Sequence, residues 1–164
     1  MKTRLFLMMG CPGSGKSTFL KENINIFNSP KIISRDKIRF SLLKEGDAYF
    51  SKEDEVFRRF INDINNSLNR GYGDTIVDAT HINSGSRLKL LRNIQASYDE
   101  AIVIWIKVPL QVALERNQSR EGIELVPEDA IRRMYGSLTK PTKEEGIDKL
   151  WTVVENGDIK YELL

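Results

Sequence analysis

The residues with the clearest chemical meaning form a glycine-rich stretch at positions 10–18, Gly-Cys-Pro-Gly-Ser-Gly-Lys-Ser-Thr, which follows the apolar residues 5–9. This is the complete G-x-x-x-x-G-K-[S/T] phosphate-binding pattern. Its glycines permit tight turns and bring backbone N–H groups close to phosphate oxygens. Lys16 can reach the β- and γ-phosphates, and the Ser17 hydroxyl can ligate Mg²⁺. The pattern predicts binding of a nucleoside triphosphate with Mg²⁺ by Gly10, Cys11, Pro12, Gly13, Ser14, Gly15, Lys16, Ser17 and Thr18.

A carboxylate and an arginine follow the second expected strand, residues 31–34. Phosphoryl transfer to an alcohol needs a group that orients the hydroxyl and accepts its proton, and Asp36 can fill that role. Arg39 lies three positions further, on the same face of the helix expected here, where it can hold a phosphate of the acceptor. Alone, Asp36 is better explained as a helix cap. The pair with Arg39 favours the chemical interpretation.

Two arginines precede a polar, glycine-containing segment. Arg116 and Arg120 are four positions apart, so they share a face if their helix extends that far. Mobile lids of kinases have this character, and their arginines neutralise charge on the phosphoryl group in transfer. The alternative is a pair of solvated arginines at a helix C-terminus. We interpret residues 116–127 as a lid.

The end of the third expected strand carries further polar residues, Asp78, Thr80 and His81. Asp78 can contact Mg²⁺ through water, orient the acceptor, or merely tether the following loop. His81 is the only histidine, so it cannot build a histidine-rich metal site. We expect Thr80 and His81 to line the acceptor pocket. Arg87, on the next helix, is expected to be a surface charge.

Strands and helices alternate along the chain. Strands are expected at 5–9, 31–34, 75–77 and 101–108, and helices at 16–25, from 35, at 51–69, 84–96, 110–117 and from 127. Ser51 and Asp54 resemble a capping box. The alternation predicts an α/β, three-layer fold of the P-loop NTPase type, with a parallel sheet, helices on both faces and ligands at the carboxyl ends of the strands. The phosphate loop, Asp36 and Asp78 should therefore converge on one cleft.

The bulk composition sets wider bounds. The 164 residues fit a single domain, with a tail after 141 whose interpretation stays open: 151–155 as a last strand, and 159–164 as an edge strand or a linker. No apolar run approaches the roughly 20 residues that span a membrane. Cys11 is the only cysteine, which excludes an internal disulfide and fits a cytoplasmic protein. The net charge of +2 is too balanced to argue for nucleic acid by itself.

Taken together, these motifs resemble the kinase domain of phage-type polynucleotide 5′-kinase over residues 5–138. The resemblance is carried by the phosphate loop, Ser-Arg-Asp with Arg39, Asp-Ala-Thr at 78–80, and the Arg-Asn-x-x-Arg segment at 116–120 followed by Val-Pro at 126–127. It implies that Asp36 is the general base on a 5′-hydroxyl. It also implies that Arg39 holds the acceptor's 3′-phosphate, that Arg120, with Arg116 beside it, clamps the γ-phosphate, and that Asp78 helps to fix the acceptor.

The predicted function is therefore Mg²⁺- and ATP-dependent phosphorylation of a 5′-hydroxyl DNA or RNA end, with a role in nucleic-acid repair. The phage enzymes also carry a phosphatase domain with a D-x-D-x-T motif, which this sequence lacks, so 3′-phosphatase activity is not expected. A kinase of a nucleoside, sugar or metabolite alcohol is the first alternative, and a nucleotide-dependent switch is the second. The sequence leaves open DNA or RNA, ATP or GTP, and the oligomeric state.

Overall fold

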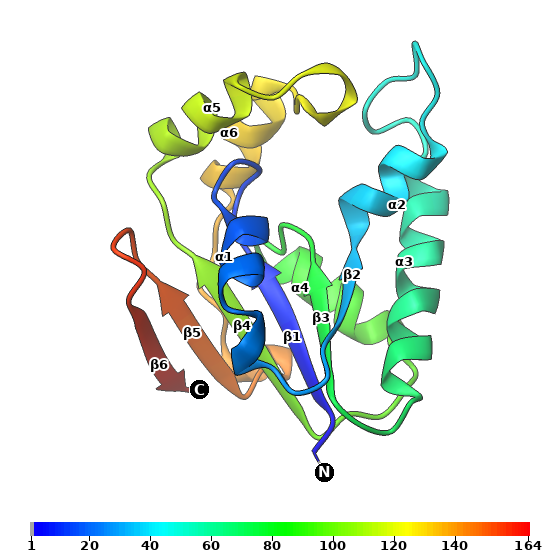
Figure 1. Cartoon of the computed structure of the whole chain (residues 1–164), viewed down its shortest axis with the longest axis vertical. Helices are drawn as coiled ribbons and strands as arrows, with labels where there is room; N and C mark the ends of the chain where they lie inside the picture. Colours follow the sequence, from blue (N-terminus) through cyan, green and yellow to red (C-terminus); the bar gives the residue numbers. More distant parts are fainter. Residues whose placement is uncertain (1) are drawn as a thin grey trace.

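The computed structural model describes residues 2–164 and contains one six-stranded sheet in the order β2-β3-β1-β4-β5-β6. The strands are β1 (Arg4–Met9), β2 (Lys31–Ser34), β3 (Asp74–Asp78), β4 (Glu100–Ile106), β5 (Lys149–Val153) and β6 (Ile159–Leu163). The first five are parallel, and β6 returns antiparallel along β5 (Figure 1). The predicted α/β fold is confirmed, and both interpretations of the tail as strands hold.

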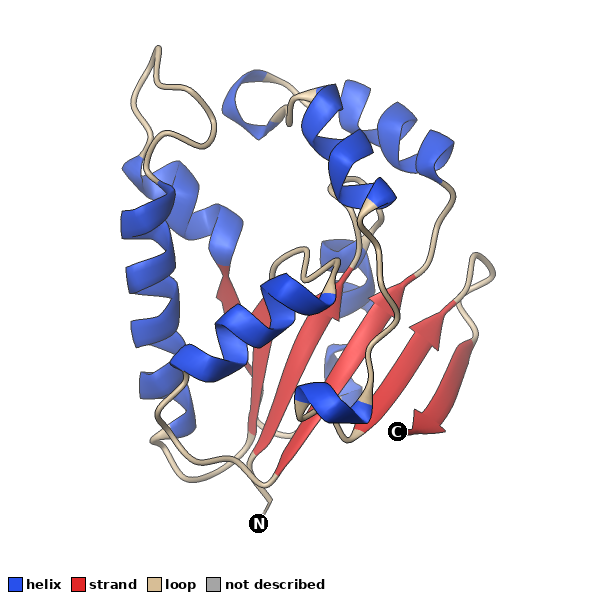
Figure 2. Cartoon of the chain, turned by 180° about the vertical axis from the view of Figure 1, so that it is seen from behind, coloured by secondary structure: helices blue, strands red, loops and turns tan. Residues whose placement is uncertain are grey.

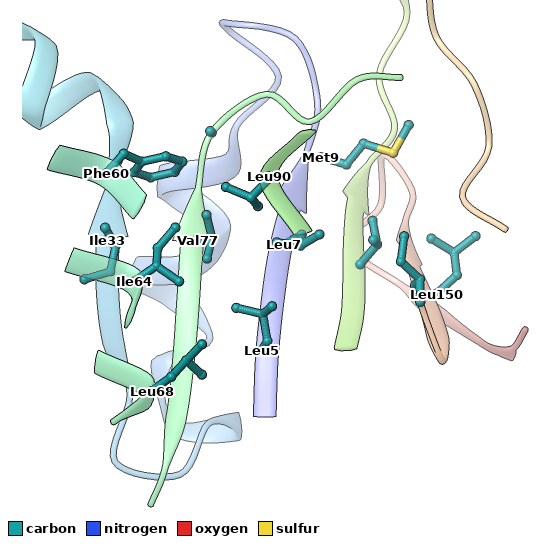
Figure 3. Close-up of a cluster of buried hydrophobic side chains, with 13 residues drawn as sticks. Leu5, Leu7, Met9, Ile33, Phe60, Ile64, Leu68, Val77, Leu90 and Leu150 are labelled. Carbon is teal, nitrogen blue, oxygen red and sulfur yellow. The ribbon is translucent and has the colours of Figure 1, made fainter. Parts of the chain in front are cut away.

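Helices cover the sheet on both faces (Figure 2). They are α1 (Lys16–Glu22), α2 (Arg35–Leu42), α3 (Glu53–Leu68), α4 (Ser84–Asn93), α5 (Leu110–Gln118) and α6 (Glu128–Gly136). Successive side chains of a strand point to opposite faces, and β1 shows the consequence. Leu5, Leu7 and Met9 pack with α3 and α4 (Figure 3), whereas Phe6 and Met8 pack with α1. Because β1 is buried on both faces, it reads as a continuous apolar run.

The strand register places the functional segments side by side. Ser34, which ends β2, is paired with Asp78, which ends β3. The residues that follow Ser34 open α2, and the Ser34 hydroxyl accepts a hydrogen bond from the Lys37 N–H as the helix cap. Arg35 and Asp36 therefore begin beside Asp78. The same edge of the sheet carries the phosphate loop after β1.

Two local expectations were wrong. The capping box of Ser51 with Asp54 does not form, because α3 begins at Glu53 and its cap residue, Lys52, makes no side-chain cap bond. Arg87 is not a surface charge, since its side chain is fully buried.

The buried Arg87 connects four parts of the chain. Its guanidinium pairs with Glu145 at 2.8 Å, and it donates to the His81 carbonyl at 3.0 Å and to the Thr139 hydroxyl at 3.2 Å. It also contacts the Met9 sulfur at 3.7 Å, just before the phosphate loop. Burial lowers the pKa of Arg87, and the hydrogen bond and charge of Glu145 oppose that shift. In the part of the chain from 2 to 164, no helix is long and apolar enough to cross a bilayer.

Candidate active site

A cleft of about 1060 Å³ lies at the carboxyl ends of the parallel strands. Its walls come from the phosphate loop, the start of α2, the loop after β3, the segment from α5 to α6, and the β5–β6 turn. This is where an open parallel sheet binds ligands, because the loops on that edge diverge. The structure brings most of the predicted site residues to this cleft: the loop from Pro12 to Thr18, Asp36, Arg39, Asp78, Thr80, Arg116 and Arg120.

The phosphate loop is shaped by its glycines. Gly13 has φ +82°, and a Cβ there would lie 2.5 Å from the Ala113 carbonyl oxygen, so the loop packs directly on α5. Gly15, at φ +100°, forms the entry to α1. The Ser14 hydroxyl is buried and has no hydrogen-bond partner among the residues described. A cradle with an unsatisfied polar atom fits a loop built to bind phosphate.

Lys16 lies folded over this loop, where its Nζ donates to the carbonyls of Gly10, at 2.9 Å, and Cys11, at 3.1 Å. Burial lowers the pKa of Lys16, and the nearby charges of Asp78 and Asp36 oppose that shift. Burial raises the pKa of Asp78, which the charge of Lys16 counteracts. The cation and the two carboxylates thus share one electrostatic environment.

Asp36 belongs to a network centred on Arg39. The Arg39 guanidinium donates to Asp36 through Nη1 and to both oxygens of Glu53, at 2.6 Å from Nε and 3.0 Å from Nη2. Glu53 also accepts from Arg35 at 3.0 Å. Burial would raise the pKa of Glu53, but the hydrogen bonds and charges of the two arginines outweigh it and hold that pKa below its usual value. Arg39 is only 5 % exposed, so this network fixes it beside Asp36, whose side chain remains about half exposed.

The two lid arginines reach the cleft without sharing a helix. α5 ends at Gln118, so Arg120 lies beyond it. Arg116 donates to the Ser14 carbonyl at 3.0 Å. Between them, the buried Asn117 side chain donates to the Val126 carbonyl at 2.8 Å and accepts from the Val126 N–H at 3.1 Å. These two bonds fasten both ends of the loop that carries Arg120.

His81 does not line the cleft. Its side chain is 4 % exposed, its ring lies parallel to Phe60, and its Nδ1 is 2.7 Å from the Met8 carbonyl oxygen. Because a carbonyl only accepts, Nδ1 carries the proton of this bond. Burial lowers the pKa of His81 to about 4. The residue ties the loop after β3 to the end of β1, and it does not line the cleft as we expected.

Several residues of the cleft were not predicted individually from the sequence. Glu53 carries no local signal, because its partners are 14 and 18 positions away and meet it only when α2 packs on α3. Tyr49 and Phe50 lie in the loop between those helices. At the opposite end, Lys107 and the β5–β6 turn complete the cleft with Val153, Val154, Glu155 and Gly157.

The donor set suits Mg²⁺ held mainly by a nucleotide. No cluster of three or more His, Cys, Asp or Glu side chains in residues 2–164 could hold a metal. The Ser17 hydroxyl lines the cleft, with Asp78 on the neighbouring strand end. Mg²⁺ at phosphate-transfer sites commonly uses one or two protein oxygens together with phosphates and water. These residues therefore fit Mg²⁺ bound as its ATP complex.

The model of the AAA_33 family, described as an AAA domain, matches residues 5–141. The chain belongs to this family. Among curated proteins it is similar to L-seryl-tRNA(Sec) kinase of Methanococcus maripaludis, at 28 % identity over 141 residues, which are 84 % of this chain and 53 % of that protein. The chain thus spans about half the length of this curated relative. The family and this relative support a phosphotransferase of the P-loop kinase type.

Solved structures agree on the fold. A chain in the Pnkp1/Rnl/Hen1 RNA repair complex is similar over 99 % of this chain and 48 % of its own, with a TM-score of 0.67 and 19 % identity. A sugar kinase from Janibacter sp. HTCC2649 is similar over 93 % of this chain and 84 % of its own, with a TM-score of 0.63 and 19 % identity. Kti12 of Chaetomium thermophilum, in complex with ADP-AlF3, is similar over 94 % of this chain and 90 % of its own, with a TM-score of 0.60 and 18 % identity. At these identities the likeness concerns the fold, and the acceptor has to be argued from the site.

Proposed function

We propose that this chain transfers the γ-phosphate of ATP to the 5′-hydroxyl of a DNA or RNA end. The observation that carries the proposal is the position of the Asp36–Arg39 pair, which faces the same cleft as Lys16, Ser17 and Arg120. A carboxylate that can accept a proton thus lies across from the groups that hold a triphosphate. That arrangement suits transfer to an alcohol more than hydrolysis.

In the proposed reaction, Asp36 orients the acceptor hydroxyl and takes its proton as the oxygen attacks the γ-phosphorus in line. The bond from the γ-phosphorus to the β–γ bridging oxygen breaks, and ADP leaves. Lys16 and Arg120 neutralise charge on the phosphoryl oxygens. Arg116 holds the phosphate loop from the lid side through its hydrogen bond to the Ser14 carbonyl. Ser17 would hold Mg²⁺ together with the nucleotide, and the bound ion would supply further charge neutralisation.

Acceptors attached to RNA have a precedent among similar proteins, since one relative is named a seryl-tRNA kinase and one structure belongs to an RNA repair complex. A small-molecule alcohol is the second candidate. The net charge of +2 favours it, because a groove that follows a phosphate backbone is normally basic. The similarity to a sugar kinase over most of both chains points the same way.

The test is transfer of label from γ-labelled ATP with Mg²⁺. The acceptors are a 5′-hydroxyl DNA oligomer, the matching RNA, both oligomers already 5′-phosphorylated, and a panel of nucleosides and sugars. We expect label on the 5′-hydroxyl oligomers only, and none with Lys16→Ala. Label on a nucleoside or sugar instead would support the second candidate. ATP hydrolysis without need of any acceptor would indicate a switch protein.

A further inference from the structure

The cleft has an aromatic end that the phosphate chemistry does not use. Beyond Arg39 it is lined by Tyr49 and Phe50, and across from them by Val126 and Met134 of the lid side. In Figure 1 the loop between α2 and α3, in cyan, stands opposite the yellow loop that follows α5. This end adjoins the Asp36–Arg39 pair, at which the proposed function puts the acceptor.

The two rings differ in how firmly they are held. Their centroids are 4.6 Å apart at an interplanar angle of 73°, and the carbon of the Arg39 guanidinium lies 4.9 Å from the Tyr49 ring centre and 5.5 Å from that of Phe50. Tyr49 also packs against the buried cluster that includes Ala113 and Ile131. Phe50, by contrast, is 39 % exposed. Tyr49 therefore anchors the pair, and Phe50 presents free ring surface to the cleft.

We infer that Phe50, supported by Tyr49, is the surface on which the base of the acceptor's terminal nucleoside stacks. The inference rests on the proposed function, because it requires an acceptor that carries a base. Unstacked bases are commonly held on aromatic side chains, at about 1–3 kcal/mol per base. Arg39 contacts both rings and Asp36, so a base on Phe50 is separated from the reacting carboxylate by a single side chain.

The chemistry of this wall favours a base over a bare sugar. Met134 and Phe50 offer apolar surface, whereas sugar hydroxyls need hydrogen-bond partners to replace water. A second pocket, of about 570 Å³, opens from Asp36 between α1 and α2 and contains Phe40. Its wall mixes Leu20 and Ile32 with charged side chains, and Arg39 does not line it. We therefore assign the base to Phe50.

The experiment compares two 5′-hydroxyl oligomers that differ only at the terminal residue, one with an ordinary base and one with an abasic tetrahydrofuran that keeps the 5′-hydroxyl. We expect the wild-type protein to prefer the ordinary end by roughly tenfold in kcat/KM, mainly through KM, which corresponds to the lower half of the stacking range. Phe50→Leu should remove that preference, because it lowers kcat/KM for the ordinary end far more than for the abasic end. Tyr72→Leu, which alters an exposed ring outside both pockets, is the matched control.

Three results would overturn this inference and leave the proposed function standing. They are equal kcat/KM of the wild-type protein on the ordinary and abasic oligomers, an equal loss of kcat/KM on both oligomers in Phe50→Leu, or a loss confined to the ordinary oligomer in Phe40→Leu. The last would place the base in the second pocket. A wild-type protein that labels neither oligomer would instead refute the proposed function, and the inference with it.

Discussion

At the scale of single residues, the site depends on which carboxylate is left free to react. Glu53 is occupied by Arg35 and Arg39, and Asp78 is mostly buried beside Lys16, whereas Asp36 accepts from Arg39 and keeps about half of its surface exposed. An oriented and accessible carboxylate is the one that can meet an acceptor hydroxyl.

Asp36→Asn should therefore lower kcat by roughly 10²–10⁴-fold, the usual contribution of a general base, without weakening ATP binding. The amide keeps an oxygen for Arg39 but cannot take the proton. Label transfer at saturating ATP measures the first effect, and stabilisation of the protein by Mg²⁺-ATP measures the second. Asp54→Asn, on the exposed side of α3, is the control, and a variant within a few-fold of wild type would remove Asp36 from this role.

His81 makes stability depend on pH. Its pKa of about 4 lies below the usual 6.5, so between these values the unfolded chain binds a proton that the native chain does not. Burial of the neutral His81 ring therefore costs no stability above pH 6.5. As the pH falls toward 4, the free energy of unfolding drops by roughly 2–3 kcal/mol. His81→Asn should flatten this loss, because the amide can donate to Met8 and tolerates the positive φ of 42° at this position. Urea unfolding at pH 7 and pH 4.5 measures this loss. The same fall in unfolding free energy between the two pH values in both proteins would contradict the prediction.

At the scale of elements, the lid is held by a side chain near the end of α5 that bonds to the backbone just before α6. Asn117 closes the loop from α5 to α6 by bonding both polar groups of Val126, and the loop then holds Arg120 over the cleft. Asn117→Ala should reduce kcat about tenfold, since misplacement of a phosphate-neutralising arginine weakens the transition state. Gln118→Ala, at the neighbouring exposed position, should not. Steady-state kinetics separates the two outcomes, and a stability loss with unchanged kcat would show that Asn117 only supports the fold.

Arg87 and Glu145 join α4 to the segment after α6. Arg87→Met should cost about 3–5 kcal/mol of unfolding free energy, because it leaves the Glu145 carboxylate buried without its partner. Adding Glu145→Gln should recover part of that loss, since the amide oxygen can still accept from the Thr142 N–H. Equilibrium urea unfolding tests both variants. Simple additivity of the two changes would contradict a coupled pair.

The elements that the sequence predicted well are those with a local signal. The phosphate loop follows from residue types at fixed spacing, and β1 from an unbroken apolar run, so both were placed correctly. Arg87, Glu53 and His81 were misjudged or missed because what they contact depends on how α2, α3, α4 and the sheet pack together. No periodicity within a helix separates a buried, paired arginine from an exposed one.

At the scale of the whole molecule, ligand binding at one edge of the sheet should stabilise the entire fold. At 100 times its dissociation constant, Mg²⁺-ATP adds about 2.7 kcal/mol, or roughly 5–10 °C in Tm for a domain of this size. Thermal unfolding with and without nucleotide measures the shift. Lys16→Ala should abolish it, and Lys21→Ala, which removes the same charge from the exposed side of α1, should keep it. An equal shift in both variants would mean that the nucleotide binds elsewhere.

The single cysteine gives this protein a built-in chemical reporter. Cys11 is 3 % exposed, packed with the cluster under the lid, and burial raises the pKa of its thiol. Because the sulfur is buried, we expect a thiol reagent to react only after a local opening around Cys11, in which the thiolate can form. The alkylation rate of the unmodified protein therefore reports on this local opening, without a dye or an introduced label. A nucleotide that bridges loop and lid would appear as a slower reaction at this one sulfur.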